Sequence, residues 1–247
     1  MKNISFQNKL IAIFILLLMA ASIFRSFYFG SDLTEVLKSV DDWSRYAKQG
    51  LDIKKNGLLI NSIEGNYNGP GGFLYNYFVA FLFFIFGDSL APIYTIQTLL
   101  LGISVAFTFW TFKDLMKRKT QIIFLCSLFI FATLDVFHHY CHVLLSENLG
   151  LFLFSTFIYS FYKSINDLPA ILQKRTTILI IAATLVRPNL VPLLVLYIGI
   201  LFLIKFRKKS PISFSLSPHL IIVLIGVLII PTRNFIQTGS WTLLPTE

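Results

Sequence analysis

The amino-acid sequence predicts an all-α, polytopic transmembrane helix bundle of about seven or eight spans, and three observations lead to that prediction. Hydrophobic residues make up 55% of the 247 residues and charged residues 13%, whereas soluble domains carry roughly 25% charged residues. The apolar residues gather in runs that short polar segments separate. The basic residues behind the net charge of +9 lie beside those runs, as in cytoplasmic loops of membrane proteins. The charge therefore needs no nucleic acid to explain it, and a soluble globular protein is excluded.

The first span is expected at about Leu10–Phe29, with Lys2 and Lys9 on the cytoplasmic side. This run lacks a small-residue cleavage site, so it is expected to stay as an anchor rather than to be removed as a signal peptide. A long extracytoplasmic loop follows over about residues 30–72. Loops of this length are usually functional or carry structure of their own. Residues 1–247 are expected to form a single domain.

Within this loop an amphipathic surface helix is predicted to begin at Asp41 or Asp42, since aspartate is a favoured N-cap residue. Apolar side chains recur behind the cap at helical spacing: Trp43, Tyr46, Ala47 and Leu51. Basic side chains accompany them: Arg45, Lys48, Lys54 and Lys55. A helix of this kind is expected to lie on the membrane surface, with its basic side chains near lipid headgroups.

The remaining apolar runs are Phe73–Phe86, Ala91–Phe112, Ile122–Leu134, Leu149–Tyr162, Thr177–Val186, Leu190–Ile204 and Leu220–Ile230. Lys174 and Arg175 are expected in a basic loop before Thr177, and the last span is expected to close at Pro231. Two full crossings by the first two runs would place the basic Lys113–Lys119 outside, against the positive-inside rule. A helix as short as Phe73–Phe86 also reaches only about 21 Å, less than the ~30 Å apolar core of a bilayer. We therefore expect Phe73–Phe112 to make one net crossing. All basic loops then lie inside, and four polar islands lie outside: Asp41–Arg45, His138–Glu147, Arg187–Asn189 and Arg233–Asn234.

The acids Asp41 and Asp42 are the leading candidates for catalysis. One of them can serve as a general base that takes a proton from an acceptor hydroxyl, oriented by its neighbour or by a cation. Adjacent helical residues point in different directions, so the two are not expected to act as a coupled pair. The alternative is that both are solvated acids at the start of a surface helix.

Two arginines, Arg187 and Arg233, follow apolar runs, and each stands before a Pro-Asn or Asn. Because Thr177–Val186 is short, Arg187 is expected partly within membrane depth, lining a cavity. Charges at that depth indicate function, and the guanidinium fork suits a phosphate. The alternative is that each arginine extends to lipid headgroups.

Glu147 stands at the edge of a span and is a candidate for orienting a sugar hydroxyl or for binding a cation. The alternative is an acid that only favours the start of a helix. His138, His139 and His142 lie nearby, but their spacing does not match a zinc motif. No cofactor is therefore expected, and a divalent metal lacks support from the sequence.

Several of these segments, in their order between the spans, resemble the GT-C glycosyltransferase superfamily. The similarity is to the branch of dolichyl-phosphate-mannose protein mannosyltransferases and bacterial aminoarabinose transferases. The segments are Asp41–Ala47, Gly69–Gly72, Phe86–Ser89, Leu145–Asn148, Leu185–Asn189, Pro231–Asn234 and Thr238–Gly239. Members of that family continue beyond the position of Glu247, so the chain is expected to be a truncated or divergent short form.

The resemblance implies an inverting transferase of the cell envelope that uses a polyprenyl-phosphate-linked sugar at the outer face of the membrane. By the same resemblance the catalytic base is Asp42, with Asp41 as the alternative, and Arg45 faces the donor phosphate. Arg187 and Arg233 are expected to bind that phosphate too, and Glu147, Asn189 and Asn234 to bind substrate. The acceptor is expected to be a glycan, a lipid or a protein. Asn68 and Gly69 replace a basic residue of the aminoarabinose branch, which argues against an aminoarabinose donor and a lipid A acceptor.

Two other classes of function remain open from the sequence. In a transporter or lipid flippase the same charges would line a pathway, although the chain has no detectable inverted repeat of the kind many transporters carry. In a non-catalytic membrane scaffold these residues would have no chemical role.

Overall fold

The computed structural model describes residues 6–29, 32–39, 41–57, 73–133, 141–167, 170–207 and 217–238. Every regular element in these residues is a helix, which confirms the all-α prediction. The α-helices are α1 (Phe6–Phe29), α2 (Leu33–Lys38), α3 (Asp42–Asn56), α4 (Phe73–Phe86), α5 (Leu90–Phe112), α6 (Arg118–Thr133), α8 (Glu147–Asp167), α9 (Ala170–Val186), α10 (Val191–Arg207) and α11 (Ser217–Thr238). Two short 3-10 helices, η1 (Lys113–Leu115) and η2 (Pro188–Leu190), join α5 to α6 and α9 to α10.

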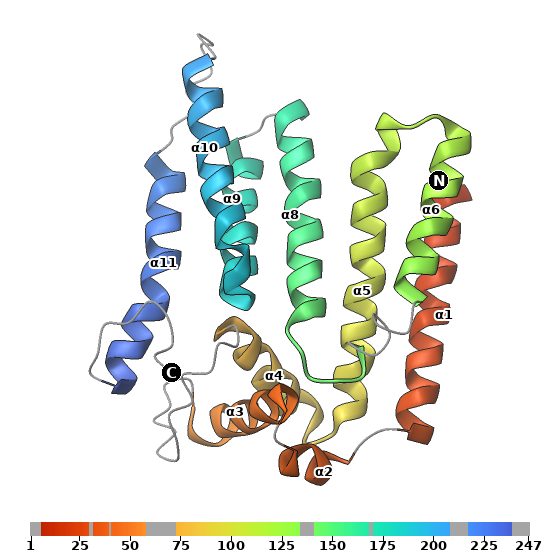
Figure 1. Ribbon diagram of the computed structural model, residues 1–247, viewed down its shortest axis with the longest axis vertical. Helices are drawn as coiled ribbons and strands as arrows, with labels where there is room; N and C mark the ends of the chain where they lie inside the picture. The colour runs from red at the N-terminus through yellow and green to blue at the C-terminus, as the bar shows by residue number, and fades with distance from the viewer. Residues whose placement is uncertain are drawn as a thin grey trace.

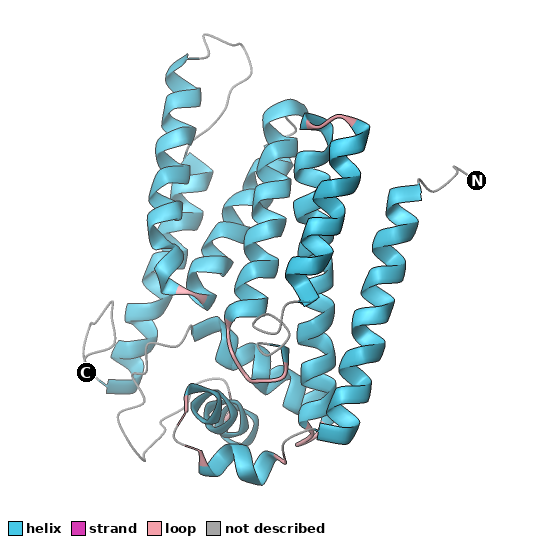
Figure 2. Ribbon diagram, turned by 45° about the vertical axis from the view of Figure 1, so that its right-hand side comes forward, coloured by secondary structure: helices cyan, strands magenta, loops and turns pink. Residues whose placement is uncertain are grey.

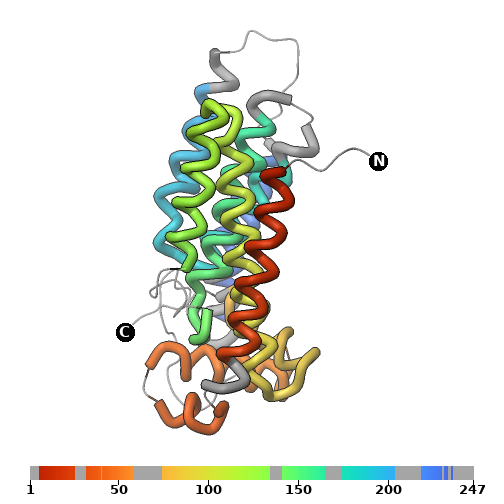
Figure 3. The backbone as a smooth tube through the Cα atoms, turned by 90° about the vertical axis from the view of Figure 1, so that its right-hand side faces the viewer, coloured from red at the N-terminus to blue at the C-terminus, as the bar shows by residue number. Residues whose placement is uncertain are grey.

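The long helices run side by side, and α2, α3 and α4 gather at one end of them (Figure 1). We call this end, defined by α2 and α3, the α3 end. The same division into a bundle and a cap of short helices is visible after rotation by 45° and by 90° (Figures 2 and 3). The turn from α5 to α6, with its basic residues Lys113 and Arg118, lies at the opposite end (Figure 1). Helix α8 begins towards the α3 end and α9 finishes towards it.

Two segments of the described chain have the length and apolar composition needed to cross a membrane, Phe6–Arg25 and Leu90–Leu115. Shorter apolar helices cover Leu74–Phe86, Pro188–Leu203 and Pro218–Ile229. An apolar helix needs about 20 residues to cross a bilayer. Length and composition alone thus support two membrane-crossing helices rather than the expected seven or eight.

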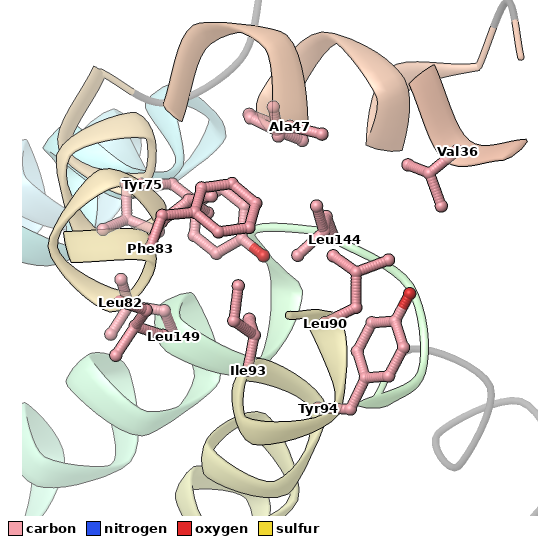
Figure 4. Packing of buried hydrophobic residues seen from close by; sticks show 13 residues of the cluster. Val36, Ala47, Tyr75, Leu82, Phe83, Leu90, Ile93, Tyr94, Leu144 and Leu149 are labelled. Carbon is pink, nitrogen blue, oxygen red and sulfur yellow. The ribbon is translucent and has the colours of Figure 1, made fainter. Parts of the chain in front are cut away.

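The apolar face of α3 packs against protein instead of facing outwards. Ala47 of α3 and Val36 of α2 are fully buried; Ala47 lies over Tyr75 and Phe83 of α4, and Val36 lies on the side of Leu90 and Tyr94 of α5 (Figure 4). Ile93 of α5 and the two leucines that flank the start of α8, Leu144 and Leu149, belong to the same core cluster. The helix begins where predicted, with Asp41 as its N-cap. The predicted contact of its apolar face with the membrane surface is wrong for Ala47, because α4 covers it.

A close approach of α3 and α4 holds the short helices at the α3 end in place. Gly50 of α3 is buried, and a Cβ atom at this position would lie 2.7 Å from Cγ1 of Val79 and 3.3 Å from the backbone nitrogen of Ala80. Only a residue without a Cβ therefore allows the two helix backbones to come this close.

Gly50→Ala is expected to destabilise the protein by about 1–3 kcal/mol, because an added methyl group in a filled core forces its neighbours to shift. Thermal unfolding of the detergent-solubilised protein measures the loss. Gly199→Ala on α10 is the matched control, since a Cβ there meets nothing within 4 Å. Equal unfolding temperatures for the two variants would contradict the close α3–α4 contact.

Two predicted helix boundaries are wrong. Helix α9 starts at Ala170 rather than near Thr177, because exposed Lys174 and Arg175 continue the helix beyond its apolar part. Helix α11 runs through Pro231 to Thr238 instead of closing at Pro231. A proline inside a helix removes one backbone hydrogen bond but does not have to end the helix.

Candidate functional site

An ion pair joins the start of α8 to the end of α9. Nη1 of Arg187 lies 3.0 Å from Oε1 of Glu147. Glu147 is the first residue of α8, and Arg187 directly follows the last residue of α9. Its backbone N–H donates to the carbonyl of Ala183 at 2.8 Å. An acid at a helix start and a base at a helix end both suit the helix dipole, so each residue stabilises its own helix as well as its partner.

A glycine one turn into α8 makes room for the arginine. A Cβ at Gly150 would lie 2.9 Å from Cδ and 3.1 Å from Cγ of Arg187. The aliphatic part of Arg187 therefore rests against the backbone of α8. This contact directs the guanidinium towards Glu147, one helical turn away on the same helix.

Gly150→Ala is expected to push the Arg187 side chain away from the backbone of α8, so that its guanidinium no longer meets a phosphate ligand, and to weaken binding of that ligand by roughly tenfold, the loss of one charge-assisted hydrogen bond. The unfolding temperature should change little, because the group that the added methyl displaces is a partly exposed side chain rather than buried core. Equilibrium binding of radiolabelled farnesyl phosphate measures the first quantity. Unaltered binding would show that this glycine does not set the position of Arg187.

Buried hydrogen bonds fix the segment that leads into Glu147. The side-chain amide nitrogen (Nε2) of Gln97, on α5, donates to the backbone carbonyls of Cys141 at 3.1 Å and Val143 at 2.9 Å. The amide oxygen of Gln97 accepts a 2.6 Å bond from the hydroxyl of Tyr75 on α4. One glutamine thus anchors the segment before α8 to both α4 and α5.

Tyr46 connects α3 to this ion pair. Its side chain is buried, and its ring packs edge-on against Tyr75, with ring centroids 4.7 Å apart. Burial raises the pKa of the Tyr46 phenol, and the carboxylates of Glu147 and Asp42 raise that pKa further. A hydrogen bond with Ser146 and the charge of Arg187 act on the pKa in the opposite direction. The phenol is therefore protonated at neutral pH and lies within electrostatic reach of both acids.

The two neighbouring acids at the start of α3 have different partners. Oδ1 of Asp42 lies 3.3 Å from Nη1 of Arg45, and the side chains are 66% and 47% exposed. Oδ2 of Asp41 instead accepts a 2.8 Å hydrogen bond from the indole of Trp43. Asp42 lies one helical turn before Tyr46 on α3, and its charge acts on the pKa of that tyrosine.

The other predicted site residues are placed less fully. Asn189 is exposed in η2, two residues after Arg187. Arg233 and Asn234 lie on the last part of α11, and their side chains are outside the described residues, as are His138 and His139. No group of three or more His, Cys, Asp or Glu side chains in the described ranges is arranged to share a metal ion.

Sequence reasoning missed three structural roles at this site. Gln97 is a single amide within the apolar run Ala91–Phe112, and a polar side chain in such a run is a signal that can be read from sequence. Tyr46 was assigned only to an apolar helix face. Gly150 carries no signal in the sequence, because its role depends on the approach of Arg187 from another helix.

Comparisons of the chain with protein-family models, with curated proteins and with solved structures find no match.

Proposed function

We propose that the chain is an inverting, polytopic membrane glycosyltransferase that moves a sugar from a polyprenyl-phosphate donor to an acceptor hydroxyl outside the cytoplasm. The observation that carries the proposal is the Glu147–Arg187 ion pair at the α3 end, which acts with Asp42 on the pKa of Tyr46, the residue one helical turn after Asp42 on α3. These residues include a carboxylate for the acceptor and a guanidinium for the phosphate. They come from three segments of the chain.

The chemistry of the transfer requires both of these charges. The acceptor oxygen forms a bond to the anomeric carbon while the bond from that carbon to the phosphate oxygen breaks. The acceptor proton passes to Asp42, which acts as the general base, and the electron pair leaves with the lipid phosphate. Arg45, 3.3 Å from Asp42, orients the base. Arg187 stabilises the charge that develops on the departing phosphate.

The substrate-binding role of Glu147 fits its partial burial. One carboxylate oxygen bonds Arg187, and the second, Oε2, is buried with no hydrogen-bond partner among the described residues. Buried carboxylate oxygens normally accept a hydrogen bond. A sugar hydroxyl supplies the donor that this oxygen requires once the carboxylate is turned towards the substrate.

Exposed apolar side chains support a multi-pass arrangement in the membrane. Large aliphatic residues that are more than half exposed occur on α1, α6, α10 and α11: Leu16, Leu17, Ile123, Ile130, Val195, Leu203, Leu224 and Ile225. Soluble proteins rarely expose apolar surface over several helices at once. Contact with lipid tails accounts for these surfaces, and the α3 end then faces outwards.

The α5–α6 turn is expected to face the cytoplasm, because its basic residues follow the positive-inside rule. After replacement of Cys126 and Cys141, Arg118→Cys should not react with an impermeant thiol reagent in intact cells and should react after the cells are opened. A cysteine at the exposed Lys48 of α3 is the matched control and should react in intact cells. Labelling of position 118 in intact cells would reverse the proposed orientation.

What happens to the bond between the sugar and the lipid phosphate distinguishes a transferase from a transporter or flippase. With a radiolabelled polyprenyl-phosphate sugar in proteoliposomes, a transferase moves the label from the lipid to an acceptor. A flippase moves the intact lipid between leaflets and leaves its linkage unchanged. Translocation of intact donor without transfer would overturn the proposal.

A further inference from the structure

The guanidinium of Arg187 is the phosphate-binding group of the proposed function, and Glu147 already holds it. Nη1 of Arg187 and Oε1 of Glu147 are 3.0 Å apart. Carboxylates and phosphates bind the arginine fork in the same way, through its N–H donors. A phosphate that approaches Arg187 must therefore either displace the carboxylate or lie next to its negative charge. In both cases Glu147 weakens the binding of the phosphate.

We propose that Glu147 is an internal competitor for Arg187, and that the phosphate of the lipid-linked donor must displace it in order to bind. This inference rests on the proposed function and adds its regulation: the Glu147–Arg187 pair closes the site until an anionic lipid opens it. The carboxylate stands in for the phosphate of the ligand. It also gives selectivity, because a neutral lipid cannot replace an anion on the guanidinium.

The contacts of Arg187 show which partner is free to move. Its Cγ and Cδ atoms rest against the backbone of Gly150, and its main chain is bonded to Ala183. Both contacts fix the arginine at the end of α9. In this exchange Glu147, rather than Arg187, changes position.

One of the two carboxylate oxygens of Glu147 takes no part in the ion pair. This atom, Oε2, is buried without a hydrogen-bond partner among the described residues, and a buried acceptor that lacks a partner is costly. Breaking this ion pair therefore costs less free energy than breaking a buried pair in which every polar atom is hydrogen-bonded. The phenol of Tyr46 lies within electrostatic range of this carboxylate and is hydrogen-bonded with Ser146, the residue before Glu147.

A simple supporting role for Glu147 leads to the opposite expectation. If the carboxylate only positions Arg187, its removal releases the arginine and weakens phosphate binding. If it competes, its removal strengthens binding. The sign of the change in affinity separates the two roles.

The test measures equilibrium binding of radiolabelled farnesyl phosphate to the purified full chain in detergent. Glu147→Gln is expected to lower the Kd by about tenfold, because it removes one charge next to the bound phosphate. Glu35→Gln is the matched control: it makes the same change of charge at an exposed position of α2, at the same end of the molecule, and should leave the Kd unchanged. Farnesol, which lacks the phosphate, should bind the wild type and Glu147→Gln equally.

Arg187→Ala, alone and combined with Glu147→Gln, completes the design. The gain from Glu147→Gln should disappear in the double variant, because there is no guanidinium left for the carboxylate to occupy. If Glu147→Gln does not fold, Glu147→Ala replaces it, with the same expected sign. An equal or higher Kd for the Glu147 variant, with weaker binding by Arg187→Ala, would overturn the competition and leave the proposed function standing. An unchanged Kd in Arg187→Ala would instead remove the phosphate role of that arginine.

Discussion

Asp42→Asn should reduce sugar transfer by on the order of 10²–10⁴-fold, the usual contribution of a general base. The substitution removes the proton acceptor while keeping the size of the side chain. Asp42 is exposed and its ion pair with Arg45 lies at the surface, so the substitution should cost little stability. Transfer of label from a radiolabelled polyprenyl-phosphate sugar by membranes with equal amounts of each variant measures the effect.

Asp41→Asn is the neighbouring comparison. Its carboxylate accepts a hydrogen bond from Trp43, and an asparagine keeps an oxygen that can accept the same bond. Transfer should therefore fall much less than in Asp42→Asn. The reverse order would make Asp41 the base, and full transfer in both variants would remove α3 from the catalytic site.

Arg187→Ala should weaken donor binding by about 1.5–3 kcal/mol, the contribution of hydrogen bonds to a charged group. Arg187→Lys keeps the charge but loses the planar fork, so its affinity for the donor should lie between those of the wild type and Arg187→Ala. Arg233→Lys and Arg233→Ala are expected to follow the same order, from the sequence pattern at the end of α11. The dependence of transfer on donor concentration measures each loss.

The same variants test whether any loss of donor binding in Arg187→Ala has a purely structural cause. If the arginine only held the ends of α8 and α9 together, Arg187→Ala would lower the unfolding temperature without changing the affinity for the donor. Unchanged donor affinity in the alanine variants of both arginines would assign them to lipid headgroups. The phosphate role would then pass to Arg45.

The helices could be predicted from the sequence because apolar runs of this length have few ways other than a helix to pair their backbone N–H and C=O groups. The start of α3 was predicted at Asp41 or Asp42, and the structure makes Asp41 the N-cap residue. The start of α9 was not predicted correctly, because the polar turn that contains Lys174 and Arg175 lies outside the apolar run, yet it continues the same helix. The path through Pro231 was missed for a related reason: the sequence alone does not show whether neighbouring helices support the backbone that a proline interrupts.

The candidate site was predictable as a set of residues but not as an arrangement. Glu147 and Arg187 were each identified from their places at the edges of apolar runs. Their ion pair requires α8 and α9 to pack antiparallel, which brings together residues forty positions apart. The fit of Gly150 against Arg187 and the position of Tyr46 among the charges depend on the same packing. No local pattern contains that information.

The most direct test of the proposed function is the stereochemistry and stoichiometry of the transfer reaction. Purified protein in proteoliposomes is supplied with a polyprenyl-phosphate sugar of known anomeric configuration and with a membrane extract as the source of acceptor. Nuclear magnetic resonance of the purified product gives the configuration of the new linkage, and the released polyprenyl phosphate is quantified in parallel. We expect a glycosidic bond of inverted configuration and one polyprenyl phosphate released for each sugar transferred. A retained configuration, or donor that stays intact while Asp42→Asn behaves like the wild type, would contradict an inverting transferase with Asp42 as its base.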